Sequence, residues 1–197
     1  MPNVNRPNGL SPIRHVHSAP YNGGGNIYSI APAYATALYV GDPVVSSGSA
    51  DPAGIPGIAL AGATGPIRGV IMGIGKDPNL YMNPNGTDIT YRPGATQTTS
   101  WYALVMDDPD ALFEVQEIGT GTPLTVADVG MNVNFAIGTG NGFVSGWTLA
   151  NTGAAVTASL QARIMGAIQR PDNAIGQYCR WAVKINNHEL AAGTVGI

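Results

Sequence analysis

Charged residues are scarce in this sequence. Asp, Glu, Lys and Arg together make up 11% of the 197 residues, against roughly 25% in an average soluble domain. Long helices and coiled coils are excluded, because they need many charged and helix-forming residues. Intrinsic disorder is excluded too, since 44% of the chain is hydrophobic and disordered chains combine low hydrophobicity with high charge. So little charge indicates either a neutral β-protein or a protein whose surface is held in an assembly.

Cysteine, basic clusters and long apolar runs are also missing. Cys179 is the single cysteine, which excludes an intrachain disulfide and a multi-thiolate metal site, and its apolar surroundings predict a core residue. The net charge is -3 and the basic residues are scattered, so no basic stripe is present for nucleic acid. No apolar run is suited to a membrane helix, and the N-terminus lacks the apolar region of a secretory signal. We therefore expect a protein made in a cytoplasm, with no nucleic-acid partner and no membrane partner.

Turn formers are abundant, with 27 Gly and 15 Pro. Short runs of β-forming residues alternate with Gly, Pro and Asn turns, which is typical of a sandwich or a closed barrel. We predict an all-β protein with very little helix: a single β-barrel or jelly-roll-like domain. Residues 1–26 are predicted as an extended N-terminal arm, residues 27–185 as the barrel or sandwich core, and residues 186–197 as a C-terminal tail. The only helical turn expected is at 125–128, ended by Gly130.

Two segments alternate between apolar and polar residues, as a strand with one buried face and one wet face does. In 131–137 the polar residues are Asn132 and Asn134. In 179–185 they include Arg180 and Lys184. A short similarity between 69–74 and 163–168 either marks two equivalent strands or arises by chance.

The segments Trp101–Met106 and Ala111–Gln116 flank Asp107-Asp108-Pro109-Asp110. This spacing predicts a hairpin with a four-residue loop. The three carboxylates in the loop could attract Ca²⁺, but the spaced ligands of a dedicated calcium loop are missing. Asx-type turns at a hairpin tip explain them without a metal.

Catalytic patterns are not found. The histidines, His15, His17 and His188, all lie in terminal segments, and no Gly-x-Ser-x-Gly sequence accompanies them, so a hydrolase triad is not indicated. His15 and His17 would project from one face of a strand and could hold a metal with a third ligand; exposed polar or interface histidines are the alternative. The acidic residues are dispersed, and nothing marks two of them as opposed across a cleft. We assign no catalytic residue, no metal site and no cofactor, and expect no enzyme.

Glycine-rich and tryptophan-containing segments are also explained without a ligand. The Gly-rich run 138–142 leads into strand-like residues and not into a helix, so we interpret it as a turn. Gly75-Lys76 lacks the earlier glycine of a P-loop. Trp101, Trp147 and Trp181 lie in predicted strands, where a core role competes with stacking on sugars.

Several short segments within residues 67–188 resemble parts of the auxiliary head proteins of tailed DNA phages. These are the cement or decoration proteins that bind the outside of the capsid. The matching segments are 67–71, 105–110 leading into 113–116, 128–132, Arg170-Pro171-Asp172-Asn173 with Gly176, and 183–186 with His188. The resemblance implies a β-barrel or jelly-roll-like subunit, a homodimer or homotrimer, that clamps neighbouring major capsid proteins. It implies no catalytic residue and no cofactor, and a location on the exterior of the virion.

An extended arm gives such a clamp backbone hydrogen bonds and apolar anchors for neighbouring subunits. The arm residues that we expect at the interface are Leu10, Ile13, Arg14 and Tyr21. Deleting residues 1–26 is then expected to abolish capsid binding while leaving the barrel folded. The alternatives are another virion component, such as a minor capsid, tail or fibre protein, and a carbohydrate-binding or receptor-binding β-sandwich.

Overall fold

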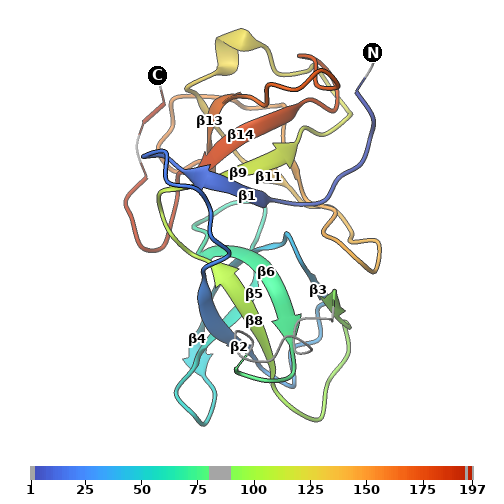
Figure 1. The fold of residues 1–197 in the computed structure, drawn as a ribbon, viewed down its shortest axis with the longest axis vertical. Coiled ribbons are helices and arrows are strands. Elements are labelled where there is room, and N and C mark those ends of the chain that lie inside the picture. Colours follow the sequence, from blue (N-terminus) through green and yellow to red (C-terminus); the bar gives the residue numbers. More distant parts are fainter. Residues whose placement is uncertain (1–2, 80–89, 194, 197) are drawn as a thin grey trace.

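The computed structural model describes residues 3–79, 90–193 and 195–196. The prediction of an all-β chain is confirmed, and Figure 1 shows two groups of strands stacked along the long axis of the molecule. Within the described residues the only helix is the 3-10 turn η2 (Val126–Asp128), at the predicted place. The strands are β1 (Ser11–His15), β2 (Asn26–Ile30), β3 (Leu38–Tyr39), β4 (Pro43–Ala50), β5 (Pro56–Leu60), β6 (Gly69–Gly75), β7 (Tyr91–Arg92), β8 (Trp101–Met106), β9 (Ala111–Gln116), β10 (Asn132–Val133), β11 (Phe135–Ala136), β12 (Thr148–Leu149), β13 (Ala162–Ala167) and β14 (Arg180–Ile185).

The first group is a closed barrel with the strand order β2-β5-β4-β6-β8. Its neighbouring strands are antiparallel, except for β2 and β5. Closure leaves no free edge in this group. Inside the barrel lies a cluster of buried apolar side chains, among them Tyr28, Ile30, Leu38, Ile71 and Ile74.

The second group is a five-stranded antiparallel sheet with the order β1-β9-β14-β13-β10, and a short β11-β12 pair accompanies it. Its core is the larger of the two apolar clusters and contains Phe113, Phe135, Trp147 and Trp181. This cluster also includes barrel residues, for example Val70. The two groups of strands therefore share a core. The predicted barrel is present as the first half of the fold, and a second sheet forms the other half.

The two groups repeat one arrangement of four strands. In the barrel, β4, β6, β8 and β2 lie side by side in that order, and in the second sheet β10, β13, β14 and β9 do the same. Both β6 and β13 shift register at an Ile-Met-Gly sequence, at residues 71–73 and 164–166. The short similarity seen in the sequence therefore marks equivalent strands.

A glycine precedes the repeated arrangement in both halves. The Gly41 N–H donates to the Ile71 carbonyl, and the Gly130 N–H donates to the Ile164 carbonyl, each at 2.8 Å. Their φ angles are +92° and +93°, a left-handed conformation that glycine adopts without strain. The two halves thus start from the same turn.

The predicted hairpin of β8 and β9 is wrong. β8 pairs with β2 and β6 in the barrel, whereas β9 pairs with β1 and β14 in the second sheet. Asp107 holds the chain to the barrel directly after β8, because its buried carboxylate accepts hydrogen bonds from the Tyr28 hydroxyl at 2.6 Å and from Asn26. Residues 107–110, between β8 and β9, therefore form a crossing segment that leads from the barrel to the second sheet.

The alternation predicted for 131–137 is also wrong in part. The segment is divided into β10 and β11, and Asn132, which was expected on the wet face, is fully buried. Its amide donates to the Thr157 carbonyl at 3.1 Å and accepts from Arg163 Nε at 3.2 Å. Ile137, expected on the buried face, is 58% exposed. In contrast, residues 179–185 have the predicted alternation: Cys179, just before β14, and Trp181, Val183 and Ile185, on β14, are all buried.

The N-terminal arm lies on its own chain. β1 pairs with β9 as the edge strand of the second sheet, and Leu10 is 1% exposed within the larger core. This corrects the expectation that residues 1–26 can be removed without harm to the fold, because their removal would open the edge of β9 and leave a cavity at Leu10. The C-terminal segment is packed as well, since Asn186 and His188 are buried.

Candidate functional site

The histidines have separate partners in the structure. His15 Nδ1 lies 3.0 Å from an Asp108 carboxylate oxygen, while His17, beyond the end of β1, lies 4.0 Å from Asp110. His188 is buried, and its Nδ1 accepts the Leu190 N–H. In the described part of the chain, no group of three or more His, Cys, Asp or Glu side chains is placed to hold a metal ion.

The carboxylates of the crossing segment bind groups of their own chain. The Asp108 carboxylate accepts the Asp110 N–H at 2.7 Å, which is the predicted Asx-type turn, although it is not at a hairpin tip. Asp110 accepts a hydrogen bond from Lys184 Nζ at 2.7 Å, and this contact lowers the pKa of Asp110. These contacts tie the crossing segment to the second sheet.

The tryptophans and the cysteine are core residues. Trp101, Trp147 and Trp181 are all at most 5% exposed, so none of them offers a ring face to a sugar. Burial raises the pKa of the Cys179 thiol to about 11, which makes the reactive thiolate rare at neutral pH. The core roles expected for these four residues are confirmed.

The predicted interface residues fall into two groups. Leu10 is buried in the core of its own chain, and Tyr21 packs partly against the same core. Ile13 is half-buried on β1, and Arg14 is exposed. Leu10 is therefore unable to contact another subunit in this fold, whereas Arg14 and part of Ile13 lie at the surface.

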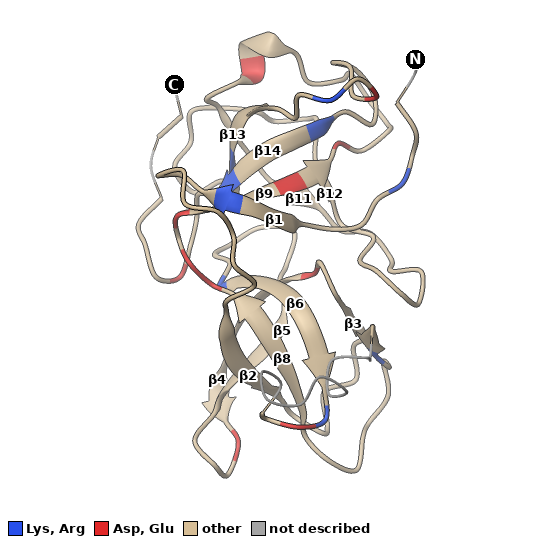
Figure 2. Cartoon of the chain, viewed as in Figure 1, with Lys and Arg blue, Asp and Glu red and all other residues tan. Residues whose placement is uncertain are grey.

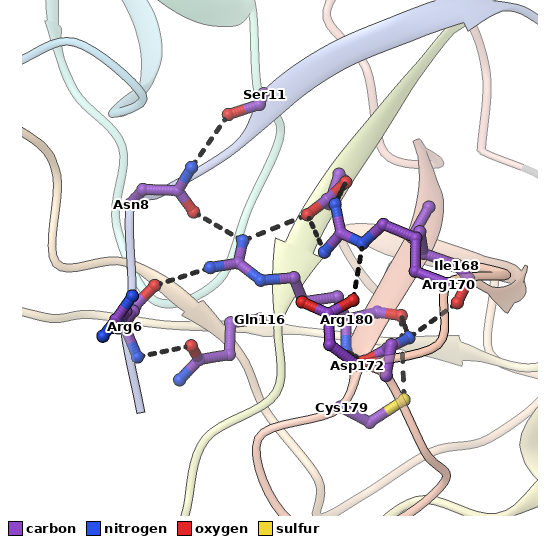
Figure 3. Close-up of polar contacts among 11 residues, drawn as sticks. Arg6, Asn8, Ser11, Gln116, Ile168, Arg170, Asp172, Cys179 and Arg180 are labelled. Carbon is purple, nitrogen blue, oxygen red and sulfur yellow. Dashed lines mark hydrogen bonds and ion pairs between the residues drawn. The ribbon is translucent and has the colours of Figure 1, made fainter. Parts of the chain in front are cut away.

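A polar cluster that the sequence did not reveal holds the N-terminal segment, residues 3–8, against the second sheet (Figure 3). Arg180, on β14, donates to the Asn8 side chain at 2.9 Å and to the Arg6 carbonyl at 2.8 Å. Asn3 exchanges hydrogen bonds with the backbone of Ala174, in the loop before β14. Because the partners are more than 170 residues apart in sequence, no local pattern predicts them.

Glu114, on β9, is the centre of this cluster. Its carboxylate accepts two hydrogen bonds from Arg170, at 3.1 and 3.2 Å, and one from Arg180 at 3.1 Å. The Glu114 side chain is 14% exposed, so water screens these ion pairs only in part. Glu114 therefore orients the arginine that binds the N-terminal segment.

We expect Glu114→Gln to lower the free energy of unfolding by about 2 kcal/mol, because an amide replaces the charged acceptor of two guanidinium groups. Amide hydrogen exchange should speed up in residues 3–8. Asp172→Asn is the matched control: Asp172 also pairs with Arg170, but it is 70% exposed, so a loss within about 0.5 kcal/mol is expected. Urea unfolding of both variants measures the difference, and equal losses would contradict the role given to Glu114.

Charged and apolar side chains are unevenly distributed over the surface. Residues 129–162 contain no Asp, Glu, Lys, Arg or His, and Figure 2 shows the loop between β11 and β12 projecting from the molecule without a charged residue. Exposed large apolar side chains occur at the N-terminal segment and in the second half of the chain, and those found among the described residues are Val4, Val126, Val129, Ile137, Phe143, Val156, Met165, Ile175, Leu190 and Val195. The barrel contributes none of them. The second half of the molecule is therefore the candidate interaction surface.

Comparison with known proteins gives no guide to function, so this surface is the main indication of it. No protein-family model, no curated protein and no solved structure matches the chain. Within the described residues, no helix has the length and apolar character needed to cross a membrane.

Proposed function

We propose that this chain is a structural protein of a tailed-phage head, without enzymatic activity, which binds the outer surface of the capsid and stabilises contacts between major capsid proteins. The sequence segments that resemble auxiliary head proteins support this proposal. So does the low charge of the surface, because the cores of protein interfaces are depleted in charged residues. A repeated shell multiplies each weak contact through avidity.

The contacts of the carboxylates are the observation that carries the proposal. Each described carboxylate accepts a hydrogen bond or forms an ion pair inside the molecule: Asp42, Asp51, Asp77, Asp107, Asp108, Asp110, Glu114, Glu117, Asp128, Asp172 and Glu189. Acid–base catalysis needs a carboxylate aimed at a substrate, whereas these carboxylates hold turns, strands and termini. Such an arrangement supports a structural role, in which the uncharged surface binds other proteins.

Binding to phage heads tests the proposal. The purified chain is mixed with mature and with immature heads of its own virus, and the bound copies and the melting temperature of the heads are measured. We expect saturable binding to mature heads, in a fixed ratio to the major capsid protein, and a higher melting temperature. Absence of binding, or binding of a few copies at one site only, would contradict a cement role; the second result would favour a tail or minor capsid component.

The proposal includes self-association of the chain as a homodimer or homotrimer. Its mass in solution, measured by light scattering over a range of concentrations, tests this part separately. A monomer at all concentrations would contradict the oligomer but not the binding to heads.

A further inference from the structure

The C-terminal segment, residues 187–193, lies against the residues that lead into β6. His188 forms a parallel bridge with Ile67. The Ile67 N–H donates to the Asn187 carbonyl at 2.9 Å, and the Glu189 N–H donates to the Ile67 carbonyl at 3.0 Å. Ile67 itself is fully buried in the core shared by the two groups of strands. The C-terminal segment therefore supplies both backbone partners of a core residue.

The ring of His188 helps to hold this segment in place. His188 is 4% exposed, and its Nδ1 accepts the Leu190 N–H at 3.0 Å. A ring nitrogen that accepts a hydrogen bond carries no proton, so Nε2 carries the single proton of the ring. Nε2 is buried as well, and no acceptor for it is found among the described residues. His188 is therefore neutral while the segment is closed.

Neither nitrogen of this ring is suited to the charged form. A proton on Nδ1 would set two donors against each other, and the hydrogen bond from Leu190 would be lost. The proton on Nε2 would share a positive charge without an acceptor, and a buried charge without hydrogen bonds is costly. Burial accordingly lowers the pKa of His188.

The charged groups around the ring do not compensate this cost. They are Asp107, Arg68, Glu189 and Asp108. The three carboxylates favour the imidazolium, and the guanidinium opposes it. Asp107 already accepts the Tyr28 hydroxyl, and Glu189 accepts the Ser46 N–H at 2.9 Å. None of the carboxylates accepts a hydrogen bond from Nε2 of His188, so burial outweighs their attraction.

We propose that His188 is a pH-sensitive latch: when its ring binds a second proton, residues 187–193 detach and leave the N–H and the carbonyl of Ile67 without partners. A released ring is hydrated and binds this proton readily, whereas the closed ring resists it. The end of the chain is held separately, because the Gly196 N–H donates to the Val156 carbonyl at 3.0 Å. The segment therefore opens as a loop. The latch acts in the free chain and needs no partner.

The direction of the pH effect follows from the lowered pKa. The closed segment has its full stability above the ordinary histidine value of 6.5. Below that value the open form gains the proton and the closed form does not. The ratio of closed to open segment then falls by up to about tenfold for each pH unit.

Amide hydrogen exchange of the full chain at pH 7 and pH 5, followed by NMR, tests the latch. Protection factors are compared, since they remove the direct effect of pH on exchange. The protection of the Ile67 and Glu189 N–H groups should fall by up to about 25-fold between pH 7 and pH 5. The Ile168 N–H, which donates to the Arg180 carbonyl at 2.9 Å in the second sheet, should not lose protection with them. Unchanged protection of Ile67, or an equal loss at Ile168, would contradict the latch.

Two variants identify the group that titrates. In His188→Asn the asparagine Oδ1 can accept the Leu190 N–H in place of Nδ1 but binds no proton, so the pH dependence of Ile67 protection should disappear. The matched control is His17→Asn, at a side chain that is 81% exposed, and its pH dependence should equal that of the wild type. A pH dependence that persists in His188→Asn would overturn the inference.

Glu189→Gln tests the neighbouring carboxylate in the same way. The fall in protection between pH 7 and pH 5 should remain in this variant. Its disappearance would make Glu189 the trigger and overturn the role of His188.

A titration of the His188 ring in the wild-type chain decides the case in which His188→Asn is open at every pH. The NMR signals of the ring should titrate with a midpoint below 6.5, and the protection of Ile67 should fall over the same pH range. Protonation of the ring without any loss of protection at Ile67 would overturn the latch.

Discussion

Replacing Trp181 with alanine is expected to lower the free energy of unfolding by about 4 kcal/mol. Trp181, on β14, is fully buried in the core shared by the two groups of strands. Its indole N–H donates to the Glu117 carboxylate at 3.0 Å, and Glu117 is also fully buried. The substitution therefore creates a cavity and removes a donor from a buried acid whose pKa is already raised by burial.

Urea unfolding followed by circular dichroism measures this loss. Trp181→Phe keeps an aromatic ring in the core but loses the N–H and part of the indole volume, so a smaller loss of about 2 kcal/mol is expected. Phe143→Ala is the control for loss of an aromatic ring, and a change within about 0.5 kcal/mol is expected at this exposed position. A loss below about 1 kcal/mol for Trp181→Ala would contradict the central place of Trp181 in the core.

Local patterns predicted the elements whose causes are local. The alternation at 179–185 matches β14, where Trp181 and Val183 face the core. The helical turn matches η2, because Thr125 and Asp128 form a capping box through their own side chains and backbone. In both cases the interactions that decide the structure lie within a few residues of one another.

Local patterns did not predict which distant strands pair with each other. Trp101–Met106 and Ala111–Gln116 have the sequence of a hairpin, but each strand finds better partners elsewhere. The buried Asp107, bound by Tyr28, turns the chain away from β8. Asn132 was expected in water because asparagine is usually exposed, and its burial depends on Arg163 and the Thr157 carbonyl.

The low charge of the sequence has a structural explanation in this fold. The few carboxylates are placed where the chain must turn, cross or be tied down, as Asp51, Asp107 and Glu114 illustrate. None of them falls in 129–162. The composition alone suggested a covered surface; the exposed apolar side chains place the candidate for that surface on the second half of the molecule and the N-terminal segment.

Burial of the Asp42 carboxylate costs stability, as burial of Glu117 does. Asp42 is 2% exposed just before β4, where it accepts the Tyr39 N–H at 2.8 Å. Burial raises the pKa of Asp42 to about 6 from an ordinary value of 3.8, although hydrogen bonds from Ser145 and Tyr39 oppose this shift. Between about pH 4 and pH 6 the folded chain therefore binds more protons at this site than the unfolded chain does, so this site lowers stability as the pH rises through that range.

Asp42→Asn is expected to raise the free energy of unfolding by about 3 kcal/mol at pH 7, because a shift of roughly two pKa units corresponds to that free energy. The asparagine oxygen can still accept the Tyr39 N–H, and its amide can donate to Ser145. Near pH 4 the advantage should largely disappear, since Asp42 is then protonated in the wild-type fold. Urea unfolding at several pH values measures the difference between the two proteins, in which the titration of all other groups cancels.

Asp51→Asn is the matched control with the opposite sign. The Asp51 carboxylate is at the surface and accepts the N–H groups of Ile55 and Ala53 and the Tyr102 hydroxyl, and the hydrogen bond from Ile55 is the main cause of its lowered pKa. Its charged form stabilises the fold above about pH 4, so this variant should be less stable than wild type at pH 7, and the difference should shrink as the pH falls below about 4. If Asp42→Asn also lost stability at pH 7, or gained the same amount at pH 4 and pH 7, the buried Asp42 carboxylate would not be the source of the cost.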